Sequence, residues 1–300
     1  MLVYLSELVA PSVLERLKNH VEVVDTFDRI EEIDAMLIRK QVVSRQIMEK
    51  AKNLKIISRH GVGCDMIDME AANELGIKVL NLPGANALSV AELAVSFMLA
   101  LARKLKLADM GLQKGAFKTF APKETIGIDT YGKTLALIGT GNIAQHVASM
   151  MRGFNMRVIA YSPHLTDEKA AQLGYERFDN IDDMLSEADY INVSVPLMDT
   201  TRNLINEESF KKMKNTAILV NTARGGIVNE NALYNALVNN QIWGAASDVF
   251  TEEPPKKDNP LLSLDNFIAT PHFGSSTYEC MERCGNMAVD NIFNCLGIKD

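Results

Sequence analysis

Short runs of β-branched and other apolar residues alternate along the chain with segments of helical periodicity. In the first third, this pattern predicts strands at 2–5, 21–24, 35–38, 55–58 and 78–81. A second set opens at residue 133 and predicts strands at 134–139, 157–162, 190–195, 217–222, 244–249 and 266–270. Such alternation is typical of parallel sheets joined by crossover helices. We therefore expect an α/β fold with two doubly wound parallel-sheet domains.

Helix-start signals stand between the first runs. Ser44 precedes RQIMEKAKN and Asp68 precedes MEAANELG, so each is expected to cap a helix. Ser89 and Glu92 have the spacing of a capping box before a long apolar helix. Gly76 is the expected stop of the helix that Asp68 begins.

The domain boundaries are predicted from three features. A length of 300 residues is about twice that of a common single domain. A polar stretch rich in Gly and Lys interrupts the periodicity at 109–132, as a boundary or an arm would, and the last helix follows the final strand with no strand of its own to cover. We expect a discontinuous flavodoxin-like domain over 1–100 and 273–300, and a Rossmann domain over 101–272 with an arm at about 105–132.

The composition narrows the class of protein. A formal charge of −7, without a basic arm, argues against nucleic acid as a partner. The longest apolar stretch, 90–102, contains Glu92 and is too short for a membrane span, and no signal peptide is visible after Met1. Four cysteines are too few for a disulfide framework, so a cytoplasmic protein is expected.

A metal site is not expected. Cys280 and Cys284 are four residues apart and would share one helix face. No nearby His, Cys or carboxylate completes the set of ligands that a tetrahedral site needs.

The segment TLALIGTGNIA has the pattern of a dinucleotide-binding loop. Gly139 and Gly141 follow a predicted strand and open a helix, and Ala144 replaces the third glycine of the pattern. The glycines permit a tight turn and a close approach to a pyrophosphate, which the helix N-terminus stabilises. Ser162 stands where an acid would bind the ribose hydroxyls of NAD. We expect NAD, with NADP left open because serine does not repel a phosphate.

Six motifs resemble the D-isomer-specific 2-hydroxyacid dehydrogenases, and most closely the D-3-phosphoglycerate dehydrogenases. They are SRHGVGCDMID (58–68), NLPGANALSVAELAVSFMLALAR (81–103), GKTLALIGTGNIA (132–144), NTARGGIVNENAL (221–233), DVFTEEP (248–254) and TPHFGSST (270–277). The resemblance implies hydride transfer between a nicotinamide and the 2-carbon of a D-hydroxy acid. It also implies a cleft between a substrate domain and the nucleotide domain, and a homodimer.

The family's catalytic residues match Arg224, Glu253 and His272, and these residue types suit the chemistry. Reduction of a 2-keto acid needs a proton for the developing alkoxide and a cation for the carboxylate. An imidazole ordinarily titrates near neutrality and is a natural proton donor, which a neighbouring carboxylate favours in its charged form. A guanidinium matches the planar carboxylate better than an ammonium does.

Further site residues are implied by the same resemblance. The expected cofactor contacts are Gly139, Gly141, Asn142, Ile143, Ser162, Val195, Pro196, Thr222, Ala223, Asp248 and Gly274, with Asp248 holding the nicotinamide carboxamide. The expected substrate contacts are Arg59, Gly61, Val62 and Gly63. The glycines would present main-chain amides to the substrate carboxylate, and Arg59 would bind a phosphate.

Two other functions stay open. One is a glyoxylate or hydroxypyruvate reductase with the same three catalytic residues. The other is a nucleotide-sensing relative without enzymatic activity, which the intact set of catalytic residues disfavours. The sequence ends at Asp300, so the regulatory domain of many phosphoglycerate dehydrogenases is expected to be absent.

Overall fold

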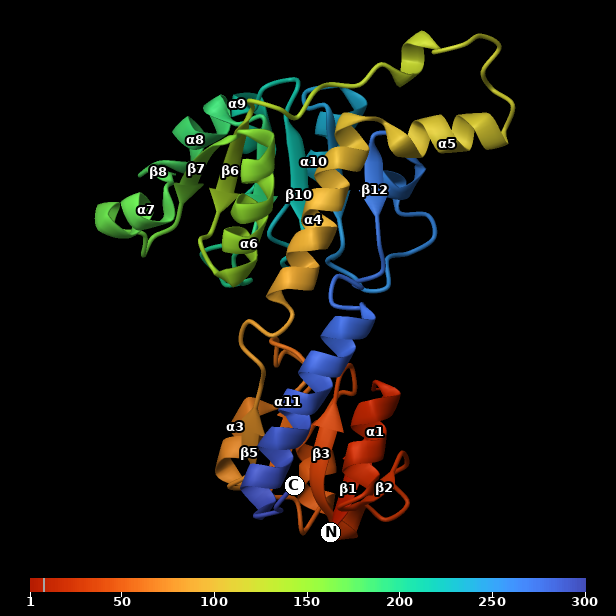
Figure 1. Cartoon of the computed structure of the whole chain (residues 1–300), viewed down its shortest axis with the longest axis vertical. Coiled ribbons are helices and arrows are strands. Elements are labelled where there is room, and N and C mark those ends of the chain that lie inside the picture. The colour runs from red at the N-terminus through yellow and green to blue at the C-terminus, as the bar shows by residue number, and fades with distance from the viewer. Residues whose placement is uncertain (8) are drawn as a thin grey trace. The chain divides into compact units, whose positions relative to one another are not determined.

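The computed structural model describes residues 1–7 and 9–300, which form two compact units. Unit 1 comprises Met1–Ser89 and Ser275–Asp300, and unit 2 comprises Val90–Gly274. Each unit has one wholly parallel sheet with helices on both faces, so the expected fold class is confirmed (Figure 1).

Unit 1 is built on a sheet of five strands in the order β2-β1-β3-β4-β5. This is the flavodoxin-like order. Each strand overlaps a run that the apolar pattern predicts. The strands are β1 (Leu2–Leu5), β2 (Glu22–Val24), β3 (Ile33–Ile38), β4 (Ile56–Arg59) and β5 (Lys78–Leu80).

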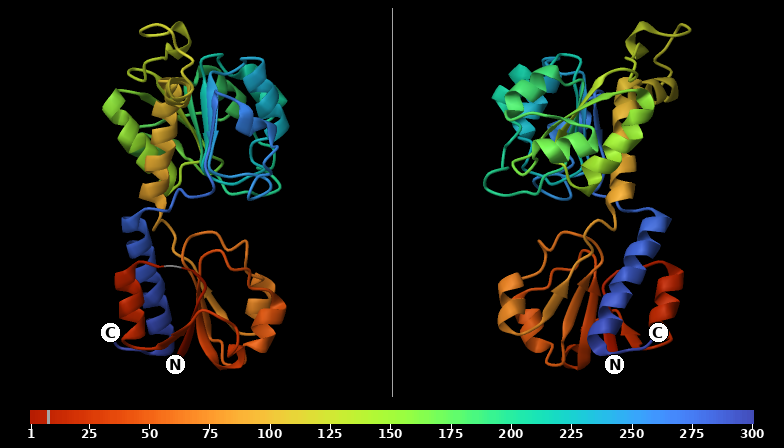
Figure 2. Two further views of the ribbon diagram at one scale, coloured as in Figure 1. Left: turned by 90° about the vertical axis from the view of Figure 1, so that its right-hand side faces the viewer. Right: turned by 60° about the vertical axis from the view of Figure 1, so that its left-hand side comes forward.

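Helices cover both faces of the unit 1 sheet (Figure 2). On one face α1 (Pro11–Lys18) and α11 (Tyr278–Leu296) lie side by side, and their buried side chains form one apolar core with β1, β3 and β4. On the other face α2 (Arg45–Lys50) and α3 (Met69–Glu74) bury a second core. A 3-10 turn, η1 (Ile30–Glu32), precedes β3.

Unit 2 has a sheet of seven strands in the order β12-β11-β10-β9-β6-β7-β8. The chain starts at the centre, moves to one edge through β7 and β8, and then returns to fill the other side, so the strand order reverses beside β6. The strands are β6 (Thr134–Ile138), β7 (Arg157–Tyr161), β8 (Glu176–Arg177), β9 (Tyr190–Val193), β10 (Ile218–Asn221), β11 (Gly244–Ser247) and β12 (Phe267–Ala269).

The helices of unit 2 form two layers. The long helix α4 (Ala87–Ala102), which begins in unit 1, packs with α6 (Asn142–Met151) on one face of the sheet. On the other face lie α8 (Ile181–Glu187), α9 (Glu207–Lys212) and α10 (Glu230–Val238). The remaining helical elements are α5 (Leu105–Gln113), α7 (Asp167–Leu173), η2 (Lys123–Thr125), η3 (Arg152–Phe154) and η4 (Pro260–Ser263).

Several local predictions are wrong. Strand β8 was not predicted, because its two residues are both exposed and give no apolar signal. Ser89 lies inside α4, where its hydroxyl is 3.2 Å from that of Thr277. Ser44 is the N-cap residue of α2 as predicted, but its side chain forms no cap bond. The Asp68 cap is confirmed, since its carboxylate accepts the Ala71 N–H.

Two kinds of feature are missing from residues 1–7 and 9–300. No helix there combines the length and the apolar character that a bilayer span requires. No three or more His, Cys, Asp or Glu side chains of these residues gather as metal ligands would. Cys280 and Cys284 do lie together on α11, with their sulfur atoms 3.7 Å apart.

The contact between α1 and α11 yields a first prediction. A Cβ at Gly285 would lie 2.9 Å from both γ-carbons of Val13, so no larger side chain fits without moving a helix. We expect Gly285→Leu to lower the free energy of unfolding by about 1–3 kcal/mol, the usual cost of overpacking. Denaturant unfolding measures it. Asn294→Leu, at an exposed position of the same helix, is the control, and equal stability of the two variants would show that α11 is not held this closely.

Candidate active site

The residues predicted to bind the cofactor or to act in catalysis lie mostly in segments of unit 2 that follow strands of its parallel sheet. Since the strands run the same way, their carboxyl ends lie at one edge, where ligands of open α/β sheets bind. Gly139 follows β6, Ser162 follows β7, and Val195 and Pro196 lie just beyond β9. The segments that carry Arg224, Glu253 and His272 follow β10, β11 and β12.

The turn between β6 and α6 has the form that a pyrophosphate needs. Gly139 has a φ of 91°, and a Cβ there would lie 2.6 Å from the carbonyl oxygen of Ser194. Gly141 is the N-cap of α6, and a Cβ there would meet no atom within 4 Å, so the approach to the helix N-terminus is open. Asn142 and Ile143 form the first turn of α6, whose N–H groups have no partner within the helix.

Ser162 stands at the end of β7 and is half-buried. The structure brings a cation to this edge that the sequence did not suggest: Arg177 on β8 pairs in register with Ala160. Its guanidinium already forms ion pairs with Asp167 and Asp179. The carboxylates therefore offset the charge of Arg177, which could otherwise attract a phosphate.

Arg224 lies in a turn that is shaped by Asn221 at the end of β10. The Asn221 side chain accepts the Ala223 N–H at 3.1 Å and donates to the Arg224 carbonyl at 3.0 Å. This local bonding is typical of Asn at strand ends. Gly225 then approaches the next loop so closely that a Cβ would lie 1.9 Å from the carbonyl oxygen of Phe250. The turn of Arg224 and the loop before Glu253 are thus packed backbone against backbone.

Thr222 lies in the same turn and is buried. Its hydroxyl oxygen has no hydrogen-bond partner among the described residues. An orphaned buried hydroxyl is uncommon in proteins and needs a partner. Because it stands at the edge where the open glycine turn also lies, this hydroxyl fits a contact to a bound dinucleotide.

Glu253 and His272 form a hydrogen-bonded pair. His272 Nδ1 is 2.7 Å from Glu253 Oε2, while Glu253 Oε1 accepts the Phe250 N–H at 3.0 Å. Burial alone would raise the pKa of the Glu253 carboxyl. The hydrogen bonds from His272 and Phe250, together with the charges of His272 and Arg224, outweigh burial and lower this pKa below its ordinary value. Glu253 is therefore ionised at neutral pH.

Asp248 holds the turn in which His272 stands. Its side chain is buried, and it accepts hydrogen bonds from the Thr270 hydroxyl at 2.6 Å, the Phe273 N–H at 2.9 Å and the Gly274 N–H at 2.8 Å. His272 itself has a φ of 52°, in the left-handed region. A carboxylate offers about four acceptor positions. One remains for the nicotinamide carboxamide, a contact that stays a prediction.

In unit 1, the residues predicted to bind substrate form a loop after β4. Arg59 Nε donates to the Gly63 carbonyl at 2.9 Å, and its Nη1 donates to the His60 carbonyl. Asn81 holds Val62 from the other side, through a bond of 2.7 Å to its carbonyl oxygen. These bonds from Arg59 stabilise the loop itself, so the predicted phosphate contact of Arg59 stays a prediction.

His60, in the same loop, is a buried structural residue. Its Nε2 lies 3.3 Å from the carbonyl oxygen of Met281 on α11, and burial lowers the pKa of its imidazole. The imidazole is therefore uncharged at neutral pH, and its hydrogen bond to Met281 links the loop to α11.

Known proteins similar to this chain identify its family. Residues 95–274 match the sequence model of the D-isomer specific 2-hydroxyacid dehydrogenase NAD-binding domain. A hydroxypyruvate reductase of Thermotoga maritima is 46% identical over 288 residues, which are 95% of this chain and 92% of that protein. A D-3-phosphoglycerate dehydrogenase of Methanocaldococcus jannaschii is 45% identical over 269 residues, 89% of this chain, which spans only 51% of that protein.

A solved structure agrees. The D-lactate dehydrogenase of Aquifex aeolicus, complexed with NAD and lactic acid, superposes on this chain with a TM-score of 0.82 at 26% sequence identity. The superposition covers 99% of this chain and 97% of the lactate dehydrogenase chain. The chain therefore belongs to the D-isomer-specific 2-hydroxyacid dehydrogenase family, and unit 2 contains the family's NAD-binding domain.

The open space at Gly141 yields a second prediction. We expect Gly141→Val to weaken NADH binding at least about tenfold, or 1.4 kcal/mol, because the added side chain occupies the pyrophosphate position. The free energy of unfolding should change by less than about 1 kcal/mol, since a Cβ at this position meets no protein atom within 4 Å. Fluorescence titration with NADH and denaturant unfolding measure the two effects. Unchanged NADH affinity would place the cofactor elsewhere.

Proposed function

We propose that this chain transfers a hydride between NAD(H) and the 2-carbon of a D-2-hydroxy acid, with D-3-phosphoglycerate and 3-phosphohydroxypyruvate as the principal pair. The observation that carries the proposal is the hydrogen-bonded pair of Glu253 and His272 at the carboxyl edge of an NAD-binding domain. Arg224 belongs to the same edge, and its charge acts on Glu253.

The proposed mechanism assigns one role to each side chain. NADH, when bound, supplies the hydride that reduces the 2-carbon. His272 donates its proton to the former keto oxygen, and Glu253 stabilises the imidazolium before transfer. Arg224 binds the substrate carboxylate through two parallel hydrogen bonds. In the oxidation direction His272 accepts the hydroxyl proton, and every other role is unchanged.

The substrate carboxylate is proposed to bind the main-chain amides of Gly61, Val62 and Gly63, while Arg59 binds the phosphate. A second candidate function is reduction of hydroxypyruvate or glyoxylate, which lack a phosphate. The bonds from Arg59 to its own loop favour this candidate, because they give the arginine a role that needs no phosphate.

An absorbance assay of NADH oxidation tests the proposed function. The substrates are 3-phosphohydroxypyruvate, hydroxypyruvate, glyoxylate and pyruvate at equal concentrations. We expect the highest kcat/KM with 3-phosphohydroxypyruvate. A higher value with hydroxypyruvate or glyoxylate would support the second candidate, and no turnover with any of the four would contradict both.

Arg59→Ala separates the two candidates. We expect kcat/KM for 3-phosphohydroxypyruvate to fall at least about tenfold further than kcat/KM for glyoxylate, since a charge-assisted hydrogen bond contributes about 1.5–3 kcal/mol. Asn81→Ala is the control, because Asn81 holds the same loop without a charge. It should reduce both values alike. Equal losses in Arg59→Ala would limit this arginine to supporting the loop.

The cofactor is proposed to be NAD with modest selectivity over NADP. Ser162 forms at most one hydrogen bond to the ribose and does not repel a 2′-phosphate. Selection for NADP needs a cation, yet His164 and Lys169 are accompanied by the acids Asp167 and Glu168, and Arg177 is paired with carboxylates.

Ser162→Asp tests this choice of cofactor. We expect the ratio of kcat/KM with NADH to that with NADPH to rise about tenfold or more, which corresponds to roughly 1.4 kcal/mol. Ser162→Asn, which adds the same bulk without the charge, should change the ratio much less. A wild-type enzyme that prefers NADPH would overturn the assignment of NAD.

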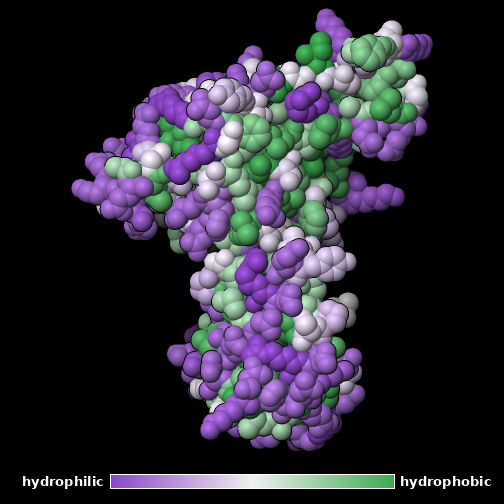
Figure 3. Space-filling model, in the orientation of Figure 1, coloured by the Kyte–Doolittle hydropathy of each residue, from purple (hydrophilic) through white to green (hydrophobic). Residues whose placement is uncertain are grey.

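We propose a homodimer because the arm, residues 105–132, has an exposed apolar surface. Apolar side chains gather on this segment, at the upper right of Figure 3. Phe120 is 100% exposed, and other large apolar side chains that are more than half exposed follow the same segment: Leu105, Leu112, Ile126 and Tyr131. Exposed apolar surface of this kind favours association.

The four cysteines are all free thiols, which suits the reducing cytoplasm that we propose as the location.

Phe120→Asp tests the role of the arm. A charge at the centre of an apolar interface is costly to bury, so we expect the molecular mass in solution to fall from that of a dimer to that of a monomer. Analytical ultracentrifugation measures it. Leu75→Asp, at an exposed apolar position in unit 1, should leave the dimer intact. A wild-type monomer, or a dimeric Phe120→Asp, would contradict the proposal.

A further inference from the structure

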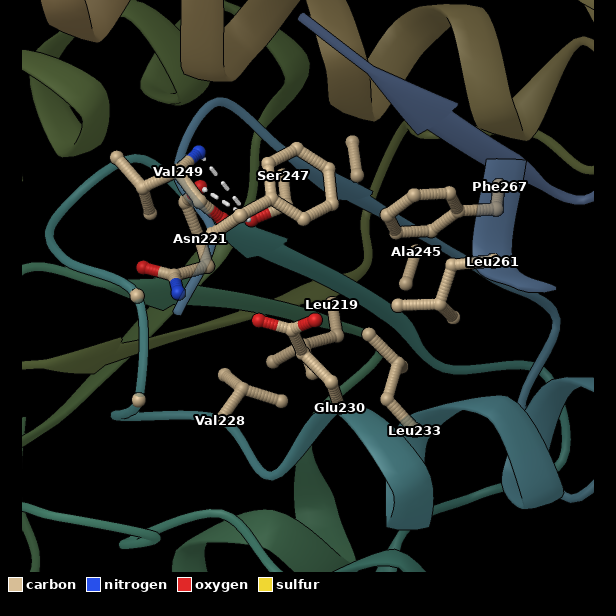
Figure 4. A pocket seen from close by; sticks show the side chains of 14 residues that line it. Leu219, Asn221, Val228, Glu230, Leu233, Ala245, Ser247, Val249, Leu261 and Phe267 are labelled. Carbon is tan, nitrogen blue, oxygen red and sulfur yellow. Dashed lines mark hydrogen bonds between the residues drawn. The ribbon is translucent and has the colours of Figure 1, made fainter. Parts of the chain in front are cut away.

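Glu230 places a carboxylate at the junction between α10 and the loop that carries Glu253 (Figure 4). It is the first residue of α10. Its Oε1 accepts the Thr251 N–H at 2.7 Å, and its Oε2 accepts from the Asn259 side chain at 3.3 Å. The carboxylate therefore ties the start of a helix to the main chain of the loop.

The surroundings of Glu230 are mostly apolar. The space that it lines is bounded by Leu219, Val228, Leu233, Val249, Phe250, Leu261 and Phe267, with Asn221 and Ser247 as polar neighbours. The free volume is about 10 Å³, hardly room for one water molecule. A substrate does not fit there. Glu230 is half-buried at the rim of this space, and its bond to Thr251 lies on the exposed side.

The loop held by Glu230 is the one that orients the proposed proton donor. Two successive N–H groups of this loop are fixed by carboxylates: Phe250 by Glu253, and Thr251 by Glu230. Glu253 then uses its second oxygen to hold His272. Glu230 is thus connected to the imidazole through the main chain of the loop and then through Glu253.

The same loop also supports the turn of Arg224. A Cβ at Gly225 would lie 1.9 Å from the carbonyl oxygen of Phe250, so the two backbones are packed directly against each other. A shift of the loop would therefore displace both the acid that holds His272 and the turn that presents Arg224.

We propose that Glu230 is a positioning residue, which fixes the loop at 250–253 so that Glu253 keeps His272 oriented for the reaction. This inference rests on the proposed function for its catalytic meaning. Glu230 acts only through the loop, since the bonds described for it go to Thr251 and Asn259.

Loss of the Glu230 carboxylate has a predictable effect on the geometry of the site. The Thr251 N–H loses its acceptor on Glu230, the loop loosens, and Glu253 moves away from the imidazole for part of the time. His272 is then correctly oriented less often, so proton transfer in carbonyl reduction slows.

The test compares kcat for carbonyl reduction at pH 7 in the wild type, Glu230→Ala, Glu230→Gln and Glu252→Gln. We expect Glu230→Ala to lower kcat at least about fivefold, because a positioned acid contributes far more than that to the rate. Glu230→Gln should recover much of this loss, because its amide oxygen still accepts the Thr251 N–H. Glu252→Gln is the matched control, since Glu252 belongs to the same loop but is exposed and pairs with Lys256.

A second readout does not depend on activity. NMR relaxation of the His272 imidazole, assigned with a His272→Asn variant, should show a more mobile ring in Glu230→Ala than in the wild type. Equal ring mobility, with or without a lower kcat, would overturn the positioning role. If Glu230→Ala does not fold, the ring mobility in Glu230→Gln relative to Glu252→Gln decides. Failure of the wild type to reduce any keto acid would instead overturn the proposed function, and the NMR measurement would still report on Glu230.

Discussion

The hydrogen bond between Glu253 and His272 is the interaction on which the account of this site depends. At 2.7 Å it is short enough for a charge-assisted bond, and the lowered pKa of Glu253 keeps the acceptor ionised. A histidine alone at this edge would be an exposed ring with no fixed orientation. The carboxylate fixes the orientation of the ring, which a proton donor for an alkoxide requires.

Three features of unit 2 keep that pair in place. Asp248 binds three donors of the segment that contains His272, Asn221 shapes the turn of Arg224, and Glu230 fixes the loop before Glu253. Their bonds run mostly to main-chain groups, so they set the path of the backbone. The parallel sheet brings these segments to a common edge, and the side chains at the strand ends convert that edge into a site of defined geometry.

Much of the fold could be predicted from sequence, because buried parallel strands are continuous apolar runs that stand out between helices. The turn at Gly139 and Gly141 could be predicted for the same reason: its glycines follow such a run. Strand β8 could not, since Glu176 and Arg177 are exposed and their pairing with β7 leaves no pattern. The helix-cap prediction for Ser89 failed, and Ser44 occupies the N-cap of α2 without a side-chain bond, because a cap bond depends on one side-chain torsion and on tertiary contacts, which local sequence does not determine. The supporting roles of Asn221 and Glu230 depend on contacts across loops, and the sequence offered only residue types suited to them.

The most direct test of the central claim is the rate of hydride transfer in a single turnover, measured as loss of NADH absorbance after mixing with a keto acid. The account predicts that His272→Ala slows this step by about 10²- to 10⁴-fold, the usual contribution of a positioned acid, while the Kd for NADH stays within about twofold of the wild type. A His272→Ala variant that transfers hydride at nearly the wild-type rate would contradict it.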